Sequence, residues 1–349
     1  MVKLNTVNYF MVFLFSNKET YMIQTRINQK KRRRFRLKRF LLFVLIVMVL
    51  PTAFYFGFVS YKTYKATAKT YSQLERGSHS DLRDKEVTIS KDPISILLIG
   101  LENYSTNYKG GHTDSLMVAT FNPELKTMKL VSIPRDTYVY IDKKGRKDKI
   151  THAYGVGGAD ETIKAVETLL DIPIDYYVQV NFKGFKDVVN ELGGVKVNVP
   201  FDFYEHSDST GKNIYFEKGP AKLNGEKALA YARMRKQDPR GDFGRNDRQK
   251  ELIKAILDKA SSPNNVLKID KIAERLEKNI TTNLTMSQPL YFFKKYKGFP
   301  SKNIETLKIA GTDDYINDIY YFIPSEESLS EVQKQLQTHL EYKKAENKE

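Results

Sequence analysis

The sequence predicts an α/β domain with a central mixed or parallel sheet and helices on both of its faces, preceded by one transmembrane helix. Three observations lead to this prediction. After residue 92, short apolar runs alternate with stretches of helical periodicity. Residues 40–61 carry no charged side chain, and a basic block at 30–39 directly precedes them.

The uncharged segment has the length of a membrane span, because a bilayer core needs about 20 apolar residues in a helix. Pro51, near its middle, is tolerated in such helices. Eight of the ten residues from 30 to 39 are Lys or Arg, and a block of this kind stays on the cytoplasmic side. No small-residue cleavage site follows, which favours a signal anchor over a cleaved signal peptide. We therefore expect a single-pass type II protein of the cell membrane.

These boundaries divide the chain into five regions. We expect a cytoplasmic N-terminus at 1–39, the anchor at 40–61, an extracellular stalk at 62–91, a folded extracellular domain at 92–342 and a disordered tail at 343–349. The polar stalk is expected to be helical up to Gly77. Residues 9–15 are apolar but too short to span, so we expect translation in the cell to start at Met22.

Charge and cysteine content exclude several kinds of function. The first 61 residues hold 11 Lys and Arg against one acidic residue, whereas the remainder holds 46 against 41. The domain is thus only mildly basic, which does not favour duplex DNA as a partner. The absence of cysteine excludes disulfides, thiolate catalysis and Cys-ligated zinc. The usual nucleoside triphosphatase, α/β-hydrolase and zinc-protease motifs are also absent.

Apolar runs predict the strands of the domain. Residues 94–100 (ISILLIG) are continuously apolar, as is typical of a strand buried on both faces. Further strands are expected at 116–121, 128–133, 176–180 and 195–199, with a turn at 122–126 between the first two.

Helical spacing of apolar residues predicts helices between these strands. One helix carries Ile163, Val166, Leu169 and Leu170, and another carries Phe185, Val188, Val189 and Leu192 and ends at Gly193-Gly194. The alternation of strands and helices favours an α/β fold.

The candidate site is a set of arginines. Arg135 directly follows a buried strand, where α/β proteins place ligands. Arg233 and Arg235 point the same way if their segment is extended. Converging arginines need an anion, and arginine is the preferred clamp for phosphate. The alternative is that Arg135, Arg240, Arg245, Arg248 and their neighbours pair with the nearby acids Asp136, Asp238, Asp242 and Asp247.

A helix predicted after residue 242 carries Arg245 and Gln249 one turn apart. Leu252 and Ile256 continue the same face, which therefore passes from a polar head into an apolar stripe. The alternative is that Leu252 and Ile256 belong to the ordinary core.

Two acidic residues upstream are candidates for a metal site. Asp114 precedes a buried strand, and Glu102 follows the 94–100 run. Two carboxylates with phosphate oxygens are the usual ligands of magnesium. The alternative is a capping Asp and a solvated Glu. His112 and His152 are candidate bases, although isolated histidines are more often structural.

Six segments, in order, resemble the LytR–CpsA–Psr family: TDSLMVATFNP, SIPRDTYV, ITHAYGVGG, NFKGFKDVVNELGGVKVNVP, LNGEKALAYARMRK and GDFGRNDRQKELI. They cover about residues 92–260. The stretches GLENYSTNYKGG and YARMRKQDPRGDFGRNDRQK resemble most the staphylococcal MsrR-like subgroup of that family.

The resemblance implies a phosphotransferase on the outer face of the membrane with an αβα domain. Members of the family move an anionic glycopolymer, such as wall teichoic acid or capsular polysaccharide, from undecaprenyl pyrophosphate to the MurNAc 6-hydroxyl of peptidoglycan. The resemblance further implies a pyrophosphate clamp formed by Arg135, Arg233, Arg235, Arg245 and Gln249. Of these, Arg135, Arg233 and Arg235 are also expected to be catalytic. It implies that Asp114 binds Mg2+, and that the polyprenyl chain lies in an apolar tunnel between sheet and helices.

One position departs from the family pattern. The usual G-x-D-x-R reads Gly100-Leu101-Glu102-Asn103-Tyr104 here, so Glu102 replaces the second metal carboxylate and the arginine is missing. Glutamate can still bind magnesium through its longer side chain. Asp136 and Asp242 are candidates for the base that activates the acceptor hydroxyl.

Two other functions remain open. A carrier-binding protein without catalysis, or a pyrophosphatase that releases the polymer to water, would use the same clamp. An envelope-stress regulator, or transcriptional attenuator, is disfavoured as a direct role. Residues 22–39 are too few to form a DNA-binding domain and no helix-turn-helix pattern is present, so nucleic acid is not an expected partner.

Overall fold

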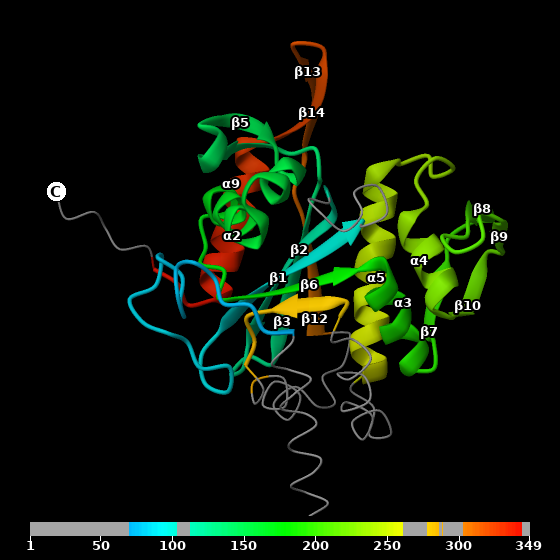
Figure 1. Cartoon of the computed structure of the whole chain (residues 1–349), viewed down its shortest axis with the longest axis horizontal. Helices are drawn as coiled ribbons and strands as arrows, with labels where there is room; N and C mark the ends of the chain where they lie inside the picture. Colours follow the sequence, from blue (N-terminus) through cyan, green and yellow to red (C-terminus); the bar gives the residue numbers. More distant parts are fainter. Residues whose placement is uncertain (1–69, 103–111, 261–277, 286–287, 289–302, 344–349) are drawn as a thin grey trace, which may run out of the picture. The chain divides into compact units, whose positions relative to one another are not determined.

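The computed structural model describes residues 70–102, 112–260, 278–285, 288 and 303–343 (Figure 1). The predicted anchor at 40–61, Met22 and residues 344–349 lie outside these ranges. Among the described residues, no helix is both long enough and apolar enough to cross a membrane.

A six-stranded mixed sheet forms the centre of the domain (Figure 1). Its order is β11 (Ile280–Thr282), β6 (Tyr176–Asn181), β1 (Ile94–Glu102), β2 (His112–Asn122), β3 (Thr127–Ile133) and β12 (Ile304–Lys308). The pairs β1–β6 and β3–β12 are parallel, and the other three are antiparallel. The predicted mixed sheet is therefore confirmed. β2 begins four residues earlier than expected because its polar start still pairs with the end of β1.

Helices cover both faces of this sheet, as predicted (Figure 1). On one face, α2 (Thr151–Leu170) and α9 (Glu326–His339) pack on side chains such as Leu97 and Ile99 of β1. The other face lies toward α3 (Phe182–Glu191) and α5 (Asp242–Ala260). Successive strand residues point to opposite faces, so the apolar run of β1 supplies both sides.

A second core lies beyond α3, against α4 (Gly225–Arg233). It includes two small sheets, one of β7 (Val195–Val199) with β10 (Gly219–Leu223) and one of β8 (Phe203–His206) with β9 (Asn213–Phe216). The strand predicted at 195–199 thus exists but does not join the central sheet. Its three valines are buried while Lys196 and Asn198 are exposed, the pattern of a strand with one solvated face.

Two hairpins complete the described fold. One joins β4 (Tyr138–Ile141) to β5 (Arg146–Lys149) through a short 3-10 turn at Asp142–Lys144. The other joins β13 (Gly311–Ile316) to β14 (Ile319–Pro324) and projects from the domain near β5 (Figure 1).

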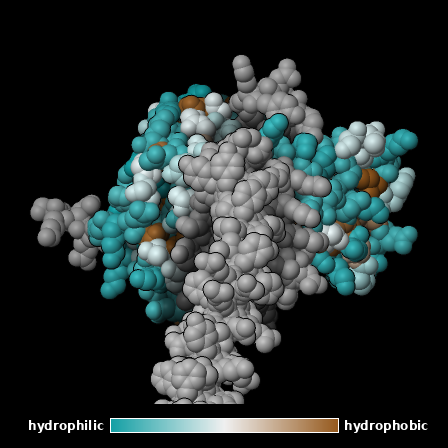
Figure 2. All heavy atoms as spheres, turned by 60° about the horizontal axis from the view of Figure 1, so that its bottom comes forward, coloured by the Kyte–Doolittle hydropathy of each residue, from teal (hydrophilic) through white to brown (hydrophobic). Residues whose placement is uncertain are grey.

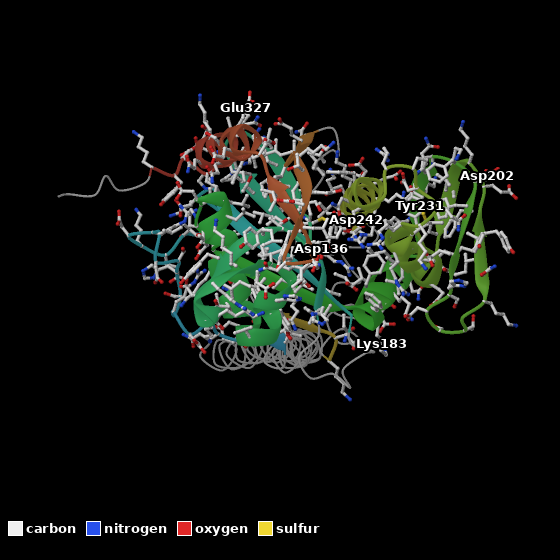
Figure 3. The ribbon with its side chains drawn as sticks, turned by 90° about the horizontal axis from the view of Figure 1, so that it is seen from above. Asp136, Lys183, Asp202, Tyr231, Asp242 and Glu327 are labelled. Carbon is white, nitrogen blue, oxygen red and sulfur yellow. The ribbon has the colours of Figure 1, made fainter. Side chains whose placement is uncertain are left out.

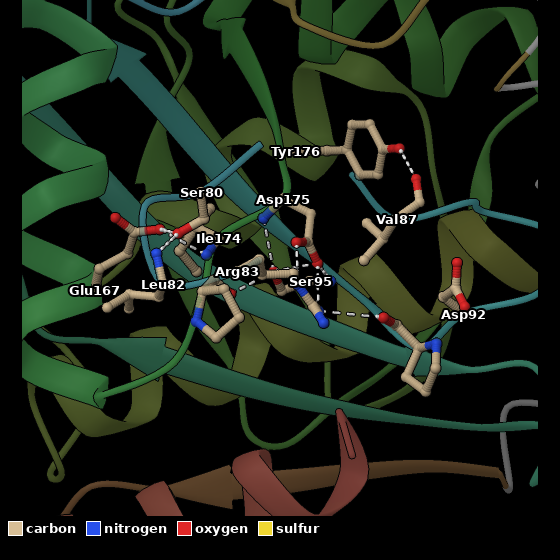
Figure 4. A network of polar contacts seen from close by, with 12 residues as sticks. Ser80, Leu82, Arg83, Val87, Asp92, Ser95, Glu167, Ile174, Asp175 and Tyr176 are labelled. Carbon is tan, nitrogen blue, oxygen red and sulfur yellow. Dashed lines mark hydrogen bonds and ion pairs between the residues drawn. The ribbon is translucent and has the colours of Figure 1, made fainter. Parts of the chain in front are cut away.

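Residues 71–77, which were expected to belong to a helix ending near Gly77, form no helix, and residues 71–89 run along the domain. Leu74 is buried in the core, and Arg76 pairs with Glu167 of α2 at 2.8 Å. Figure 4 shows the next contacts, in which Arg83 holds Asp175 through two hydrogen bonds of 2.6 and 2.9 Å. Long-range ion pairs of this kind leave no trace in the local sequence pattern, which explains the error.

The coloured part of the face shown in Figure 2 is mainly hydrophilic, and apolar residues appear on it as separate small patches. Inside the domain, apolar side chains gather in the cores and along the cavity considered next.

Candidate active site

A cavity of about 750 Å³ lies between the central sheet and helices α3, α4 and α5. Its apolar lining comes from the sheet face that points toward α5, with Leu98, Met117, Val178 and Val180, and from the helices, with Phe185, Val188, Leu229, Leu252, Ile253 and Ile256. This is the location that was expected for an apolar tunnel.

The same cavity has a cluster of charged and polar residues. The structure brings together all the described side chains proposed for the clamp and the metal: Asp114, Arg135, Arg233, Arg235, Arg245 and Gln249. Their sequence positions span 136 residues, so only the fold makes them neighbours. Their roles in binding and catalysis remain predictions.

Arg135 and Asp114 reach the cavity from adjacent strand ends. Arg135 follows Pro134 directly after β3, in a turn where the Thr137 N–H donates to the Pro134 carbonyl at 3.0 Å. Asp114 lies on β2 where the pairing with β1 shifts by one residue, between Gly100 and Leu101. Such a bulge re-aims a side chain, and Arg135 Nη1 donates to Asp114 Oδ1 at 3.1 Å.

Arg233 and Arg235 do not share an extended segment as supposed. Arg233 is the last residue of α4, and the chain leaves the helical conformation at Met234, with φ −54° and ψ 128°. The helix begins where the Asn224 side chain accepts a hydrogen bond from the Lys227 N–H, a standard N-cap. Both arginines nevertheless line the cavity, because the chain turns beside it.

Helix α5 supplies the wall predicted from its sequence. Arg245, Gln249, Leu252 and Ile256 all line the cavity. Leu252 also packs in the second core, so the two alternatives for this residue are both correct. One face of α5 therefore leads from an arginine into apolar surface.

Positive charge at the cavity is only partly compensated by acids. Asp242 lies 3.5 Å from both Arg235 and Arg245, and Asp208 lies 3.5 Å from Arg233. Burial lowers the pKa of the Arg245 guanidinium, and Arg135 and Arg235 lower it further, against the effects of Asp242 and Asp114. A buried cation with too little counter-charge is stabilised by an anion.

For Arg135, the effect of nearby acids on the guanidinium pKa exceeds the effect of burial. Burial lowers the pKa of its guanidinium, but Asp136 and Asp114 outweigh that effect and the net pKa is raised. Within the described part of the chain, the buried Nε atoms of Arg135 and Arg245 have no hydrogen-bond partner. Each of these guanidinium groups therefore has a buried donor that no described group of the protein satisfies.

The alternative of ion pairing with nearby acids holds for Arg135 and Arg245 in the cavity, and also for two arginines that do not line it. Arg240 is 56% exposed and pairs with Asp247 at 2.8 Å. Arg248 is buried, pairs with Asp238, and also donates to the carbonyls of Tyr231 and Met234. Arg248 thereby holds the turn that carries Arg233 and Arg235, a positioning role that the sequence analysis missed and that spacing alone does not reveal.

Asp136 and Asp242, the candidate bases for the acceptor hydroxyl, lie beside the arginines rather than in the cavity lining. Asp136 pairs with Lys149 at 2.8 Å and lies 3.6 Å from Arg135 Nε. Figure 3 shows Asp136 and Asp242 near one another at the junction between the central sheet and α5. Both carboxylates act on Arg135, so both are close enough to influence the clamp.

The predicted metal site is described only in part. Glu102 ends β1, but its side chain lies outside the described residues. Among the described residues, no three His, Cys, Asp or Glu side chains gather as a metal site. A metal at Asp114 would thus depend on substrate oxygens for most of its ligands. The candidate bases His112 and His152 line a different cavity.

The αβα domain thus has one cavity that combines apolar walls with an arginine cluster. The chain belongs to the LytR_cpsA_psr family, since a model of that family matches residues 57–338.

Several known proteins are similar to this chain. The polyisoprenyl-teichoic acid–peptidoglycan teichoic acid transferase TagV of Bacillus subtilis strain 168 is 50% identical over 291 residues, covering 82% of this chain and 74% of TagV. The corresponding transferase TagU of Halalkalibacterium halodurans is 42% identical over 289 residues, covering 82% of this chain and 92% of TagU.

Solved structures agree with this assignment. The crystal structure of B. subtilis TagV has 54% sequence identity and a TM-score of 0.66, covering 72% of this chain and 99% of that one. The LytR-CPS2A-psr family protein YwtF (TagT) was solved with bound octaprenyl pyrophosphate lipid. It has 37% sequence identity and a TM-score of 0.62, covering 77% of this chain and 99% of that one.

Proposed function

We propose that this protein transfers an anionic glycopolymer, such as wall teichoic acid, from an undecaprenyl-pyrophosphate carrier to the MurNAc 6-hydroxyl of peptidoglycan. The observation that carries the proposal is the single cavity that joins an apolar lining to four arginines. The names of TagV and TagU as teichoic acid transferases, and the octaprenyl pyrophosphate bound to TagT, support it.

The arginines provide the chemistry that such a transfer needs. The acceptor oxygen attacks the phosphorus atom that bears the glycopolymer, and the bond from this phosphorus to the bridging oxygen breaks. Polyprenyl phosphate leaves, and the hydroxyl proton passes to a base, for which Asp136 and Asp242 are the candidates. Arginine donors aimed at the phosphoryl oxygens stabilise the charge that develops in the transition state.

We also propose that transfer uses Mg2+, held by Asp114 and Glu102. Asp114 fits this role because its carboxylate lines the cavity among the arginines and its side chain is 23% exposed. Hard oxygen donors are the ligands that magnesium prefers. When bound, the ion would neutralise charge on the pyrophosphate.

The proposed reaction requires the domain to lie outside the cell, as the basic block at 30–39 and the apolar segment at 40–61 predict. Protease added to intact protoplasts should digest the domain. A domain that stays protected until the protoplasts are lysed would contradict this topology.

Product analysis tests the function directly. The full chain is incubated with a lipid-linked glycopolymer and soluble peptidoglycan strands, and the products are separated by size and identified by mass spectrometry. A transferase forms a phosphodiester between polymer and glycan. Release of free polymer would indicate a pyrophosphatase, and tight lipid binding without any product would indicate a carrier-binding protein.

A further inference from the structure

A second cavity, of about 700 Å³, lies between the β4–β5 hairpin, the start of α2 and the β13–β14 hairpin. Its lining includes the basic side chains Lys144, Arg146 and Lys147, the Asp148 carboxylate, His112, His152, Asn317 and the rings of Tyr138 and Tyr321, together with apolar residues such as Ile316 and Ile319. This cavity therefore offers both cationic groups and apolar surface to a ligand.

The two cavities share their supporting elements. His112 of the second cavity lies two residues before Asp114 of the first on strand β2, and Tyr138 lies three residues after Arg135. Polar contacts continue from Arg135 through Asp136 to Lys149, whose Nζ is 5.8 Å from the centre of the Tyr321 ring in the second cavity. A ligand in the second cavity is thus placed beside the arginine cluster.

Asp148 gives the second cavity its particular chemistry. It pairs with Lys144 at 2.5 Å and with His152 Nδ1 at 3.0 Å. Burial raises the pKa of its carboxyl, but the bonds from Lys144, the Lys149 N–H and His152 outweigh this and lower it to about 2. The carboxylate is therefore charged at neutral pH and accepts hydrogen bonds from hydroxyl and amide groups.

The remaining lining suits a sugar that carries carboxylates. The rings of Tyr138 and Tyr321 pack 4.7 Å apart beside the cavity, and the half-buried Tyr138 is available for contact with a pyranose. Arg146 and Lys147 are exposed on β5 and offer cations to ligand carboxylates.

We propose that this second cavity binds the acceptor of the reaction, a glycan strand with hydroxyl, amide and carboxylate groups, while the first cavity binds the lipid-linked donor. The inference rests on the proposed transferase function. It accounts for the presence of two cavities lined by neighbouring residues of the same strand, since a reaction between a lipid pyrophosphate and a glycan needs both ligands bound together.

The first experiment measures binding without turnover. Soluble, uncrosslinked peptidoglycan fragments are titrated against the full chain in detergent, using the wild type, Arg146→Ala/Lys147→Ala and the control Lys196→Ala/Lys222→Ala. The control removes two exposed lysines that pair across β7 and β10, so the change in net charge is the same. We expect fragment binding to weaken about tenfold only in the Arg146/Lys147 variant.

Octaprenyl pyrophosphate binding is measured on the same three proteins and should not change. If all three proteins bind the fragments equally, or if the wild type does not bind them at all, the inference is wrong. Because this readout needs no catalysis, it is separate from the product analysis that tests the transferase function.

The second experiment measures transfer. In the Arg146→Ala/Lys147→Ala variant, KM for the glycan acceptor should rise about tenfold while kcat and KM for the lipid-linked donor stay within twofold of the wild type. A rise in KM for the donor alone would assign the cavity to the donor polymer and overturn the proposal.

Discussion

Gln249 of α5 accepts a hydrogen bond from the Ser115 hydroxyl of β2 at 3.0 Å. Its amide nitrogen also donates to the Ala232 carbonyl at 3.3 Å, one residue before Arg233. A single side chain thus joins the strand of Asp114, the end of α4 and the helix of Arg245. The clamp predicted from scattered motifs is therefore held together by contacts within the protein as well as by any ligand.

Replacement of Arg135 by alanine should abolish most transfer while the fold survives. The side chain is 35% exposed at the cavity and supports no core packing. Loss of one donor to transition-state charge typically costs on the order of 10²–10³ in rate. Arg135→Lys should restore little, because an ammonium lacks the bidentate fork. Transfer rates and melting temperatures of both variants check this; a stable Arg135→Ala protein with near-normal rates would remove Arg135 from the site.

Arg248→Ala should destabilise the domain strongly, by about 3–5 kcal/mol, because it removes the buried partner of Asp238 and leaves this buried carboxylate with only the exposed Arg240, 3.7 Å away. Arg240→Ala is the matched control. It removes an arginine that contacts the same acid but is 56% exposed, and it should cost less than about 1 kcal/mol. Urea unfolding of the two variants gives the comparison, and similar losses in both would show that burial of the pair is not decisive.

The sequence identified the elements whose evidence is local. The run at 94–100 was readable as a buried strand because both of its faces are covered, and the α5 face was readable because Arg245, Gln249 and Leu252 recur at helical spacing. The sequence could not predict tertiary contacts between residues that lie far apart in the chain. The ion pairs that hold residues 71–89 and the buried Arg248–Asp238 pair join positions that no periodicity links.

Two features of the structure had signals in the local sequence. The alternation in Val195–Val199 is typical of a strand with one face in solvent, and such a strand fits poorly inside a covered sheet. Asn224 before a helical run is a common N-cap, which argued for a helix reaching Arg233. In contrast, the second cavity depends on the β13–β14 hairpin lying beside β5, and no local pattern predicts that arrangement.

His339 should make the domain less stable as the pH falls below about 6.5. Burial, together with Lys129, lowers the pKa of the folded ring to about 4, and both ring nitrogens bond to threonine hydroxyls, of Thr120 at 2.8 Å and Thr127 at 2.9 Å. The unfolded chain binds the proton near pH 6.5, so stability is complete above that pH and is lost as the pH falls toward 4.

The expected loss from this residue is about 2 kcal/mol between pH 7.5 and 5. Urea unfolding at pH 7.5 and pH 5 measures it, with His339→Gln as the control that cannot titrate. The wild type should lose more stability than the variant over this range. Equal losses would show that His339 is not the group responsible.

Ile256→Glu should weaken lipid binding without affecting the arginines. Ile256 lines the apolar part of the cavity on α5, where a carboxylate would replace apolar contact with the polyprenyl chain. We expect at least about a tenfold loss of affinity for octaprenyl pyrophosphate. Ile256→Leu keeps the volume and should bind almost normally. If both variants bind as the wild type does, the lipid chain does not occupy this cavity.

The final prediction concerns the metal, where this chain departs from its family pattern. Magnesium often takes one or two carboxylates and completes its shell with substrate phosphate oxygens, so Asp114 with Glu102 is sufficient in principle. Asp114→Ala should be severe, since this carboxylate lines the cavity beside Arg135. Glu102→Asp should be mild or raise activity, whereas Glu102→Ala should increase the magnesium concentration needed for half-maximal transfer without abolishing it. A magnesium titration of the three variants with a lipid-linked donor decides between these outcomes. Full activity in excess chelator, or an unchanged requirement in Asp114→Ala, would place the ion elsewhere or exclude its use.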